Sequence, residues 1–453
     1  MILANALPKI KAFLRPAKLP ATTTRLVISL IAAFLHHPGR MSASQAAAAV
    51  RSQARHRAQL VRFLARSHWS KDWLLLTSVA DLLLQQEAHR PGTWVFIIDQ
   101  TYCGQSGQKT ENTFSRANYR SRAKKSHRKQ KKHARRSCHG FVCGLLITPS
   151  GFRLPSCRSY YTEAYCQQQQ RPYRKQTELA AELIAQVATP AGARVIVLGD
   201  TAFDARCIQQ ACAQRQFTWI VPVNPERVLA GVKPRPKIRS LADTLSAADF
   251  EAVRLVPGRG VLAPYQRAAR CRSGPKAPAR TFWAHAEKRA VHNVGEVLLV
   301  LSTNQQPLTG SKVDVQKVLM TNDRKWTAAE VVGWYTLRWQ IEVFFKELKS
   351  GLGLDEYRFR QFVKVENWVQ ACLVTFVYLE WYRAQQLARP GRSEKEKSWW
   401  RWQRSYGVGR SVLARAEEND LAWLLRRSAT RSGLRKLRQV LRAALPLEYR
   451  HAA

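Results

Sequence analysis

The residues best suited to chemistry gather in one stretch of the C-terminal half. At about 100° per residue, a helix over residues 325–349 would bring Tyr335, Arg338, Glu342 and Lys349 within roughly a 60° stripe of one face. A carboxylate flanked by three groups that can bind phosphate is unusual beside a core. The alternative is a solvated charged face with an ordinary i,i+4 pair from Arg338 to Glu342.

The helix that must carry these four residues has a clear start in the sequence. Thr327 followed by Glu330 forms a capping box, which satisfies free amides at a helix N-terminus. Only Gly333 interrupts the helical pattern that follows. We therefore predict one helix of about five or six turns.

Two more carboxylates follow apolar runs that predict buried strands. Residues 94–98 end in Asp99, and residues 194–198 lead through Gly199 into Asp200. Parallel neighbours would bring these strand ends together, where open α/β sheets place their sites. An Asp at a strand end is also a common turn former or helix cap. The functional interpretation depends on both residues occurring together with Glu342.

The predicted elements around these carboxylates run in the order strand, strand, strand, helix, strand, helix, strand. They comprise the first apolar run, a hairpin over 138–155, a helix over 175–187, a strand over 194–198, a helix over 204–214 and a strand over 217–223. Further short strands are predicted at 251–256, 261–271, 281–289 and 297–303. A long helix within 356–387 is apolar nearly all round and is therefore expected to be buried.

These residues resemble a known family. The strand order with Asp99, Asp200 and Glu342 is similar to that of the DDE transposases, which have a ribonuclease-H-like catalytic core. The stripe is similar, without a gap, to the Y-R-E-K signature of the bacterial insertion-sequence-four family: Tyr335-x2-Arg338-x3-Glu342-x6-Lys349.

The two Asp motifs are less specific. Asp200 to Phe203 resembles the family's second motif, an Asp followed after two residues by an aromatic. Asp99-Gln100-Thr101 departs mildly from the more usual Asp-Gly-Thr. The resemblance extends over residues 90–388.

The residue patterns and the resemblance together predict an α/β fold with five parts. An N-terminal helical DNA-binding domain, with a helix-turn-helix as one interpretation, and a basic helical C-terminal region flank a ribonuclease-H-like core that a β-rich insertion divides. The expected boundaries are 1–90 for the DNA-binding domain, 91–223 and 321–388 for the core, 224–320 for the insertion and 389–453 for the C-terminal region.

The implied chemistry is phosphodiester cleavage. It needs an activated oxygen nucleophile and compensation for charge on the leaving oxygen, which two Mg²⁺ ions about 3.5–4 Å apart can supply through carboxylate ligands. By resemblance, Asp99 would bridge both ions, with Asp200 on one and Glu342 on the other, and Mn²⁺ could substitute. The expected phosphate-binding residues are Tyr335, Arg338, Lys346 and Lys349.

Composition supports a polyanionic partner. The 453 residues carry a formal net charge of +43, with only 31 acidic residues, so binding through phosphates should be sensitive to salt. No apolar run reaches the 18 or so residues of a membrane span. The nine Cys residues lack a repeated metal-ligand spacing, which favours buried thiols in a reducing compartment. We expect a protein of the bacterial cytoplasm that associates with the nucleoid and has no membrane partner.

Further DNA contacts are predicted with alternatives left open. Helices over 45–51 and on to Ala65 fit either a helix-turn-helix or any small helical bundle. A cationic tract that includes Arg128, Lys129, Lys131 and Lys132 fits either a solvated loop or a phosphate-backbone clamp. Trp283 fits either a core position or, by resemblance, a residue that stacks on a flipped base. The basic tail beyond 389 fits either a dimer contact or a DNA surface.

The resemblance implies a cut-and-paste transposase. Such an enzyme binds double-stranded DNA at terminal inverted repeats, cleaves the element ends, through DNA hairpins in this family, and joins the freed strands to target DNA. Synapsis of two ends implies a homodimer. The alternatives are a structure-selective nuclease of the same fold and a basic DNA-binding protein that has lost catalysis.

Overall fold

The polypeptide forms two units: a sheet unit, Ala80–Lys346, and a helical unit, Met1–Val79 with Glu347–Ala453. The structure is a computed structural model. It describes residues 7–36, 45–46, 60–65, 72–105, 110–117, 135–224, 226–231, 235–256, 260–265, 279–310, 312–402, 430 and 432.

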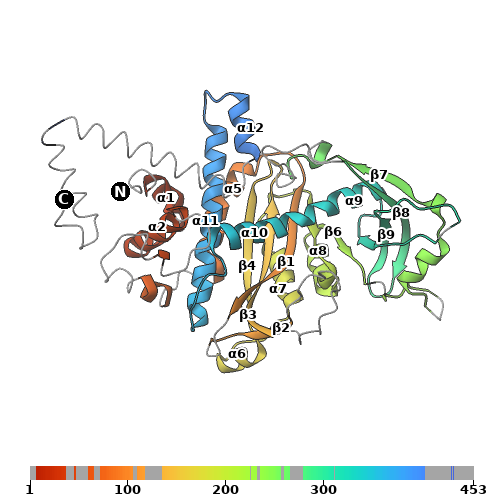
Figure 1. Cartoon of the computed structure of the whole chain (residues 1–453), viewed down its shortest axis with the longest axis horizontal. Coiled ribbons are helices and arrows are strands. Elements are labelled where there is room, and N and C mark those ends of the chain that lie inside the picture. The colour runs from red at the N-terminus through yellow and green to blue at the C-terminus, as the bar shows by residue number, and fades with distance from the viewer. Residues whose placement is uncertain are drawn as a thin grey trace, which may run out of the picture. The chain divides into compact units, whose positions relative to one another are not determined.

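The sheet unit is built on one 10-stranded sheet in the order β2-β3-β1-β5-β6-β10-β9-β8-β7, with β4 paired to β3 (Figure 1). The strands are β1 (Trp94–Gln105), β2 (Phe114–Ala117), β3 (Arg135–Ile147), β4 (Arg153–Tyr160), β5 (Val195–Leu198), β6 (Thr218–Pro222), β7 (Glu251–Leu255), β8 (Arg280–Val291), β9 (Gly295–Thr303) and β10 (Lys317–Thr321). β5 pairs in parallel with both β1 and β6, and the other pairings are antiparallel. The continuous apolar runs lie at the start of β1 and in β5, where every side chain is buried, as strands covered on both faces require.

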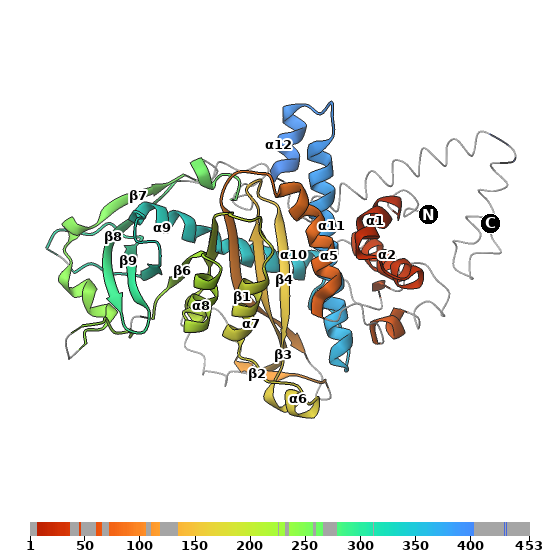
Figure 2. The same ribbon diagram turned by 180° about the vertical axis from the view of Figure 1, so that it is seen from behind.

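Helices cover both faces of this sheet. The two opposite views place α7 and α8 on one face and α9 with the start of α10 on the other (Figures 1 and 2). The α-helices of the unit are the last part of α5 (Leu74–Glu87), α6 (Glu163–Gln168), α7 (Gln176–Gln186), α8 (Arg206–Gln214), α9 (Ala328–Tyr335) and the first part of α10 (Trp339–Leu352). Its described 3₁₀ turns are η3 (Thr201–Phe203), η4 (Ile238–Thr244), η5 (Ala247–Asp249), η6 (Gly260–Leu262) and η8 (Thr336–Arg338).

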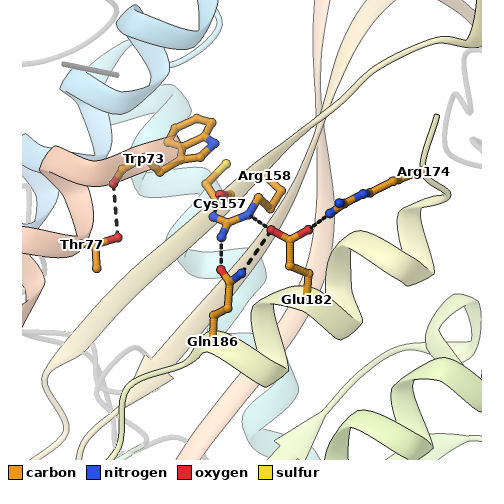
Figure 3. A network of polar contacts seen from close by, with 7 residues as sticks. All are labelled: Trp73, Thr77, Cys157, Arg158, Arg174, Glu182 and Gln186. Atoms are coloured by element: carbon orange, nitrogen blue, oxygen red, sulfur yellow. Dashed lines mark hydrogen bonds and ion pairs between the residues drawn. The ribbon is translucent and has the colours of Figure 1, made fainter. Parts of the chain in front are cut away.

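A polar network fixes which face of the sheet α7 covers. Arg158 of β4 donates from Nε to Glu182 at 2.8 Å and also bonds Gln186, so both partners lie on α7 (Figure 3). Side chains alternate along a strand, so the neighbouring Cys157 points to the opposite face. Cys157 is paired in register with Cys143 of β3, and Cys143 with Asp99 of β1. These three side chains therefore form a row on the face away from α7.

Most predicted elements of the core are confirmed. The strand predicted over 261–271 is wrong where the structure describes it: residues 260–262 form η6 and residues 263–265 a turn. The sequence pattern missed β10, which pairs with both β6 and β9. Through β10, the strands β7, β8 and β9 continue the same sheet.

The helical unit is organised around α11 (Phe362–Ala388), a helix buried along most of its length, as its apolar sequence predicts. Trp368 packs against Phe34, with ring centroids 5.0 Å apart, and Asn367 donates to the carbonyl of Leu64 at 2.6 Å. The other described helices are α1 (Leu7–Leu14), η1 (Arg15–Ala17), α2 (Ala21–His36), the first part of α5 (Leu74–Glu87), the end of α10 and α12 (Glu394–Trp402).

Several predictions concern residues that the structure does not describe. The helix-turn-helix hypothesis falls largely on such residues, because only 45–46 and 60–65 of that segment are described. Among the described helices, none is both long enough and apolar enough to cross a membrane. All eight described cysteines are free thiols, and seven of them are buried.

Candidate active site

Asp99 lies where the parallel part of the sheet ends. β1 pairs with β5 only from Trp94 to Ile97, whereas its pairing with β3 continues to Gln105. The prediction that the strand ends at Asp99 was therefore wrong, because an antiparallel partner extends it. The parallel neighbour stops two residues earlier, and this leaves the buried Asp99 at an edge between β1 and β5.

Asp200 follows β5 by two residues, as predicted. It is the N-cap of η3 and accepts a hydrogen bond at Oδ1 from the amide of Ala202 at 2.9 Å. Gly199 permits this turn, because a Cβ there would lie 3.0 Å from Cβ of Phe203. The capping interpretation of Asp200 is therefore correct, and the cap holds the carboxylate in a fixed direction.

The stretch that carries Glu342 is not one uninterrupted α-helix. Thr327 and Glu330 form the predicted capping box at the start of α9. The chain then tightens into η8 before α10 begins. At this point Thr336 Oγ1 donates to the carbonyl of Gly333 at 2.6 Å, a side-chain bond that competes with the regular helical pattern. The predicted single helix is thus corrected to α9, a 3₁₀ turn and α10.

Arg338 joins two of the three carboxylates. Its Nη1 lies 3.2 Å from Oδ2 of Asp99, and its Nη2 forms an ion pair with Glu342 four residues later. Asp99 and Arg338 are 239 positions apart in the chain. The structure therefore brings the end of the parallel sheet and the start of α10 to one place.

The pKa of Asp99 responds to the charges of both Asp200 and Glu342. Burial, with repulsion from Asp200 and Glu342, raises the pKa of Asp99 from 3.8 to about 6, although the Gln100 amide and Arg338 oppose the rise. Negative charge thus exceeds what one guanidinium compensates.

The same carboxylates also shift the pKa values of Tyr335 and Arg338. Burial, together with the negative charges of Asp200, Asp99 and Glu342, raises the pKa of the Tyr335 hydroxyl and keeps it protonated, although Arg338 opposes this. Burial opposes the charge of Arg338, but Tyr335 and the carboxylates of Asp99 and Glu342 outweigh it, and the pKa of Arg338 rises. Three residues of the predicted stripe, Tyr335, Arg338 and Glu342, therefore form one electrostatic cluster with Asp99.

The donor set has the chemistry of a divalent cation site. Carboxylate oxygens are the ligands that Mg²⁺ prefers, and the excess negative charge around Asp99 is what such an ion would neutralise. In the present arrangement a guanidinium links Asp99 and Glu342. Over the part of the chain that the structure describes, no group of three His, Cys, Asp or Glu side chains is arranged to hold a metal ion. The carboxylates fit the ion chemically, and Arg338 supplies positive charge between two of them.

Lys317 belongs to this cluster and was missed from the sequence. Its ammonium lies 5.0 Å from the centroid of the Tyr335 ring. It is the first residue of β10, the strand that the sequence pattern did not reveal. Without β10, nothing in the spacing of Lys317 and Tyr335 indicates that they meet.

The remaining predicted residues are placed as follows. Lys346 is exposed on α10, and Lys349 lies in the last turn of α10, in the helical unit. Arg128, Lys129, Lys131 and Lys132 lie outside the described residues. Trp283 is half-buried in β8 next to Ala284, which shares a row with Ser302 and Lys317. By strand alternation, Trp283 faces the opposite side of the sheet from Lys317, so its stacking role stays a prediction without support from this placement.

Comparison with known proteins gives the family. No curated protein matches the chain. A family model described as a transposase DDE domain matches residues 90–378, which include the predicted carboxylates Asp99, Asp200 and Glu342. DDE transposases use divalent metal ions, in agreement with the carboxylate cluster. The chain therefore belongs to the transposase DDE domain family.

Proposed function

We propose that this transposase is a cut-and-paste enzyme of the insertion-sequence-four type, with Asp99, Asp200 and Glu342 as its catalytic carboxylates. The observation that carries the proposal is the double contact of Arg338 with Asp99 and Glu342. This contact unites residues of the Y-R-E-K signature with the end of the parallel sheet. The net charge of +43 supports double-stranded DNA as the substrate.

The three carboxylates would hold two Mg²⁺ ions, with Mn²⁺ as a substitute. Once bound, the ions supply Lewis-acid activation of the attacking oxygen and stabilise the charge on the leaving oxygen. Each protein residue has a distinct task. The buried position of Asp99 keeps one carboxylate away from bulk water, and the η3 cap orients Asp200. Glu342 lies in the first turn of α10.

Arg338 has a second task in this proposal. A guanidinium can bind two phosphate oxygens at once, so Arg338, which contacts Asp99 and Glu342, would also bind the DNA backbone beside these carboxylates. Tyr335, which stays protonated, can donate a hydrogen bond to a phosphate oxygen. Lys346 and Lys349, farther along α10, would contact neighbouring phosphates as point charges.

A cleavage assay tests the proposal. The DNA that flanks the coding sequence should contain paired inverted repeats, and a labelled duplex ending in one repeat is the substrate. With Mg²⁺, we expect nicks at the element end, a hairpin product, and transfer of the labelled strand into a target plasmid. Sedimentation of the protein with the repeat should show two copies of the chain on two ends.

The controls separate the alternatives. A duplex with a scrambled repeat should remain uncut, and so should the true repeat in EDTA. Cuts confined to branched DNA would support a structure-selective nuclease instead. Binding of the repeat without any cut in Mg²⁺ or Mn²⁺ would refute an active transposase.

A further inference from the structure

We propose that Lys317 is an additional phosphate-binding residue of this site, which holds the DNA backbone next to the carboxylate cluster. The inference rests on the proposed function, because it takes the phosphodiester substrate from there. It adds a residue from β10, outside the Y-R-E-K stretch.

The position of Lys317 is set by the sheet. β10 lies between β6 and β9, and Lys317 is its exposed first residue. Its ammonium lies 5.0 Å from the centroid of the Tyr335 ring, within the range of a cation–π contact. This contact directs the ammonium to the side of the sheet on which Tyr335 and Arg338 lie.

The charges around Lys317 identify it as part of the site. Partial desolvation and then repulsion from Arg338 lower the pKa of Lys317, while Glu342 opposes the effect. Two cations on separate elements therefore repel each other next to the carboxylates. A phosphodiester that binds both cations would relieve this repulsion.

Lys317 is also available for a ligand. Considering only residues that the structure describes, its ammonium forms no ion pair with a carboxylate. Lys312, five positions earlier, is exposed as well but forms an ion pair with Asp243. The two lysines have the same charge and lie in one short segment, so Lys312 provides a matched control.

The experiment measures binding of the labelled terminal-repeat duplex in EDTA over a series of salt concentrations. A phosphate contact made by one lysine adds about 1 to the slope of log affinity against log salt. We expect Lys317→Ala and Lys317→Gln to lower that slope by about 1, Lys317→Arg to keep it, and Lys312→Ala to leave it unchanged. Thermal melting of each variant verifies folding, and the exposed position of Lys317 makes the glutamine variant a mild change.

Uncharged phosphate analogues in the DNA identify which phosphate Lys317 contacts. Replacing single phosphates near the cleavage point by methylphosphonate should weaken binding by the wild type at one or two positions. At those positions the Lys317→Ala variant should lose nothing further, whereas Lys312→Ala should behave as the wild type. Equal losses in the wild type and Lys317→Ala at every position would overturn the inference.

The outcome is separable from that of the proposed function. If the wild type cuts the repeat and Lys317→Ala binds with an unchanged slope and an unchanged methylphosphonate pattern, only the role of Lys317 fails. If the wild type does not cut but the pattern shifts in Lys317→Ala, the transposase proposal fails and the phosphate contact stands.

Discussion

Two arginine–carboxylate pairs on helices have opposite surroundings. Arg338 and Glu342 form an i,i+4 pair in the sheet unit, and Glu380 and Arg383 form an i,i+3 pair on α11 in the helical unit. The side chains of the α11 pair are 0% and 1% exposed, whereas those of Arg338 and Glu342 are 17% and 32% exposed. Sequence spacing alone would classify both as ordinary helix pairs.

The difference lies in burial and in the charges around each pair. On α11, Arg383 and Glu380 form an ion pair between fully buried side chains, so neither is available for a ligand. At the candidate site, Arg338 contacts Glu342 and Asp99, and Asp200 adds further negative charge. A fully buried ion pair indicates a structural role, while a partly exposed cluster with excess negative charge indicates a place for a cation.

The largest expected effect is the loss of cleavage in variants of the candidate site. Asp99→Asn, Asp200→Asn and Glu342→Gln each remove a proposed metal ligand, so we expect cleavage of the terminal repeat to fall by at least about 10³-fold. Binding of the repeat in EDTA should remain nearly that of the wild type, because phosphate contacts carry it. Single-turnover cleavage and a gel shift measure the two quantities. Cleavage at the wild-type rate in any of these variants would remove that residue from the site.

The buried pair on α11 should show the reverse. Arg383→Ala removes the guanidinium that pairs with the buried carboxylate of Glu380, and we expect a loss of about 3–5 kcal/mol in the free energy of unfolding. The rate of cleavage per folded molecule should stay within about twofold, because α11 contributes no proposed ligand. Urea unfolding with cleavage measured at a temperature where the variant is folded checks both. The double variant Glu380→Leu with Arg383→Met should recover most of the stability.

The sequence predicted the candidate residues better than it predicted how they meet. Asp200 after a buried strand and the capping box at Thr327 depend on local signals, and the structure has both as expected. The contact of Arg338 with Asp99 depends on tertiary packing over 239 positions, which spacing cannot reveal. Lys317 was missed for the same reason.

The errors have local physical causes. The apolar run stops at Asp99 and therefore predicts a strand end there, whereas pairing with β3 continues and needs no apolar side chains. The 3₁₀ turn after Tyr335 coincides with the bond between Thr336 and Gly333, which a count of apolar positions ignores. The core strands were predictable because burial on both faces demands continuous apolar residues.

A buried histidine extends the comparison to a cationic group, because burial is the largest cause of the pKa shift in both His139 and Asp99. Burial lowers the pKa of His139 from 6.5 to about 4, although its hydrogen bond to the Glu111 carbonyl opposes the change. Between these pH values the unfolded chain binds a proton that the folded chain does not. Stability from this residue is therefore complete above pH 6.5 and is lost as the pH falls toward 4.

His139→Gln removes the titration and keeps a donor for the same carbonyl. Relative to this variant, the wild type should lose about 2–3 kcal/mol of unfolding free energy between neutral pH and pH 4. Urea unfolding of both proteins at matched pH values measures the difference, and other acid-titrating groups cancel in it. A difference that does not change with pH would show that His139 titrates normally in the folded protein.

The smallest effect compares two nearly identical helix caps, one in each unit. Thr327 caps α9, where its amide donates to Glu330 at 2.9 Å and its Oγ1 accepts from the Glu330 amide at 3.2 Å. Ser393 and Glu396 make the same reciprocal bonds before α12, at 3.1 and 3.3 Å. Thr327→Ala and Ser393→Ala should each cost about 1 kcal/mol of unfolding free energy. Only α9 leads into Tyr335 and Arg338, so we expect Thr327→Ala alone to slow cleavage per folded molecule. Equal slowing in both variants would mean that cleavage depends on overall stability. It would contradict a specific effect of the α9 cap on the candidate site.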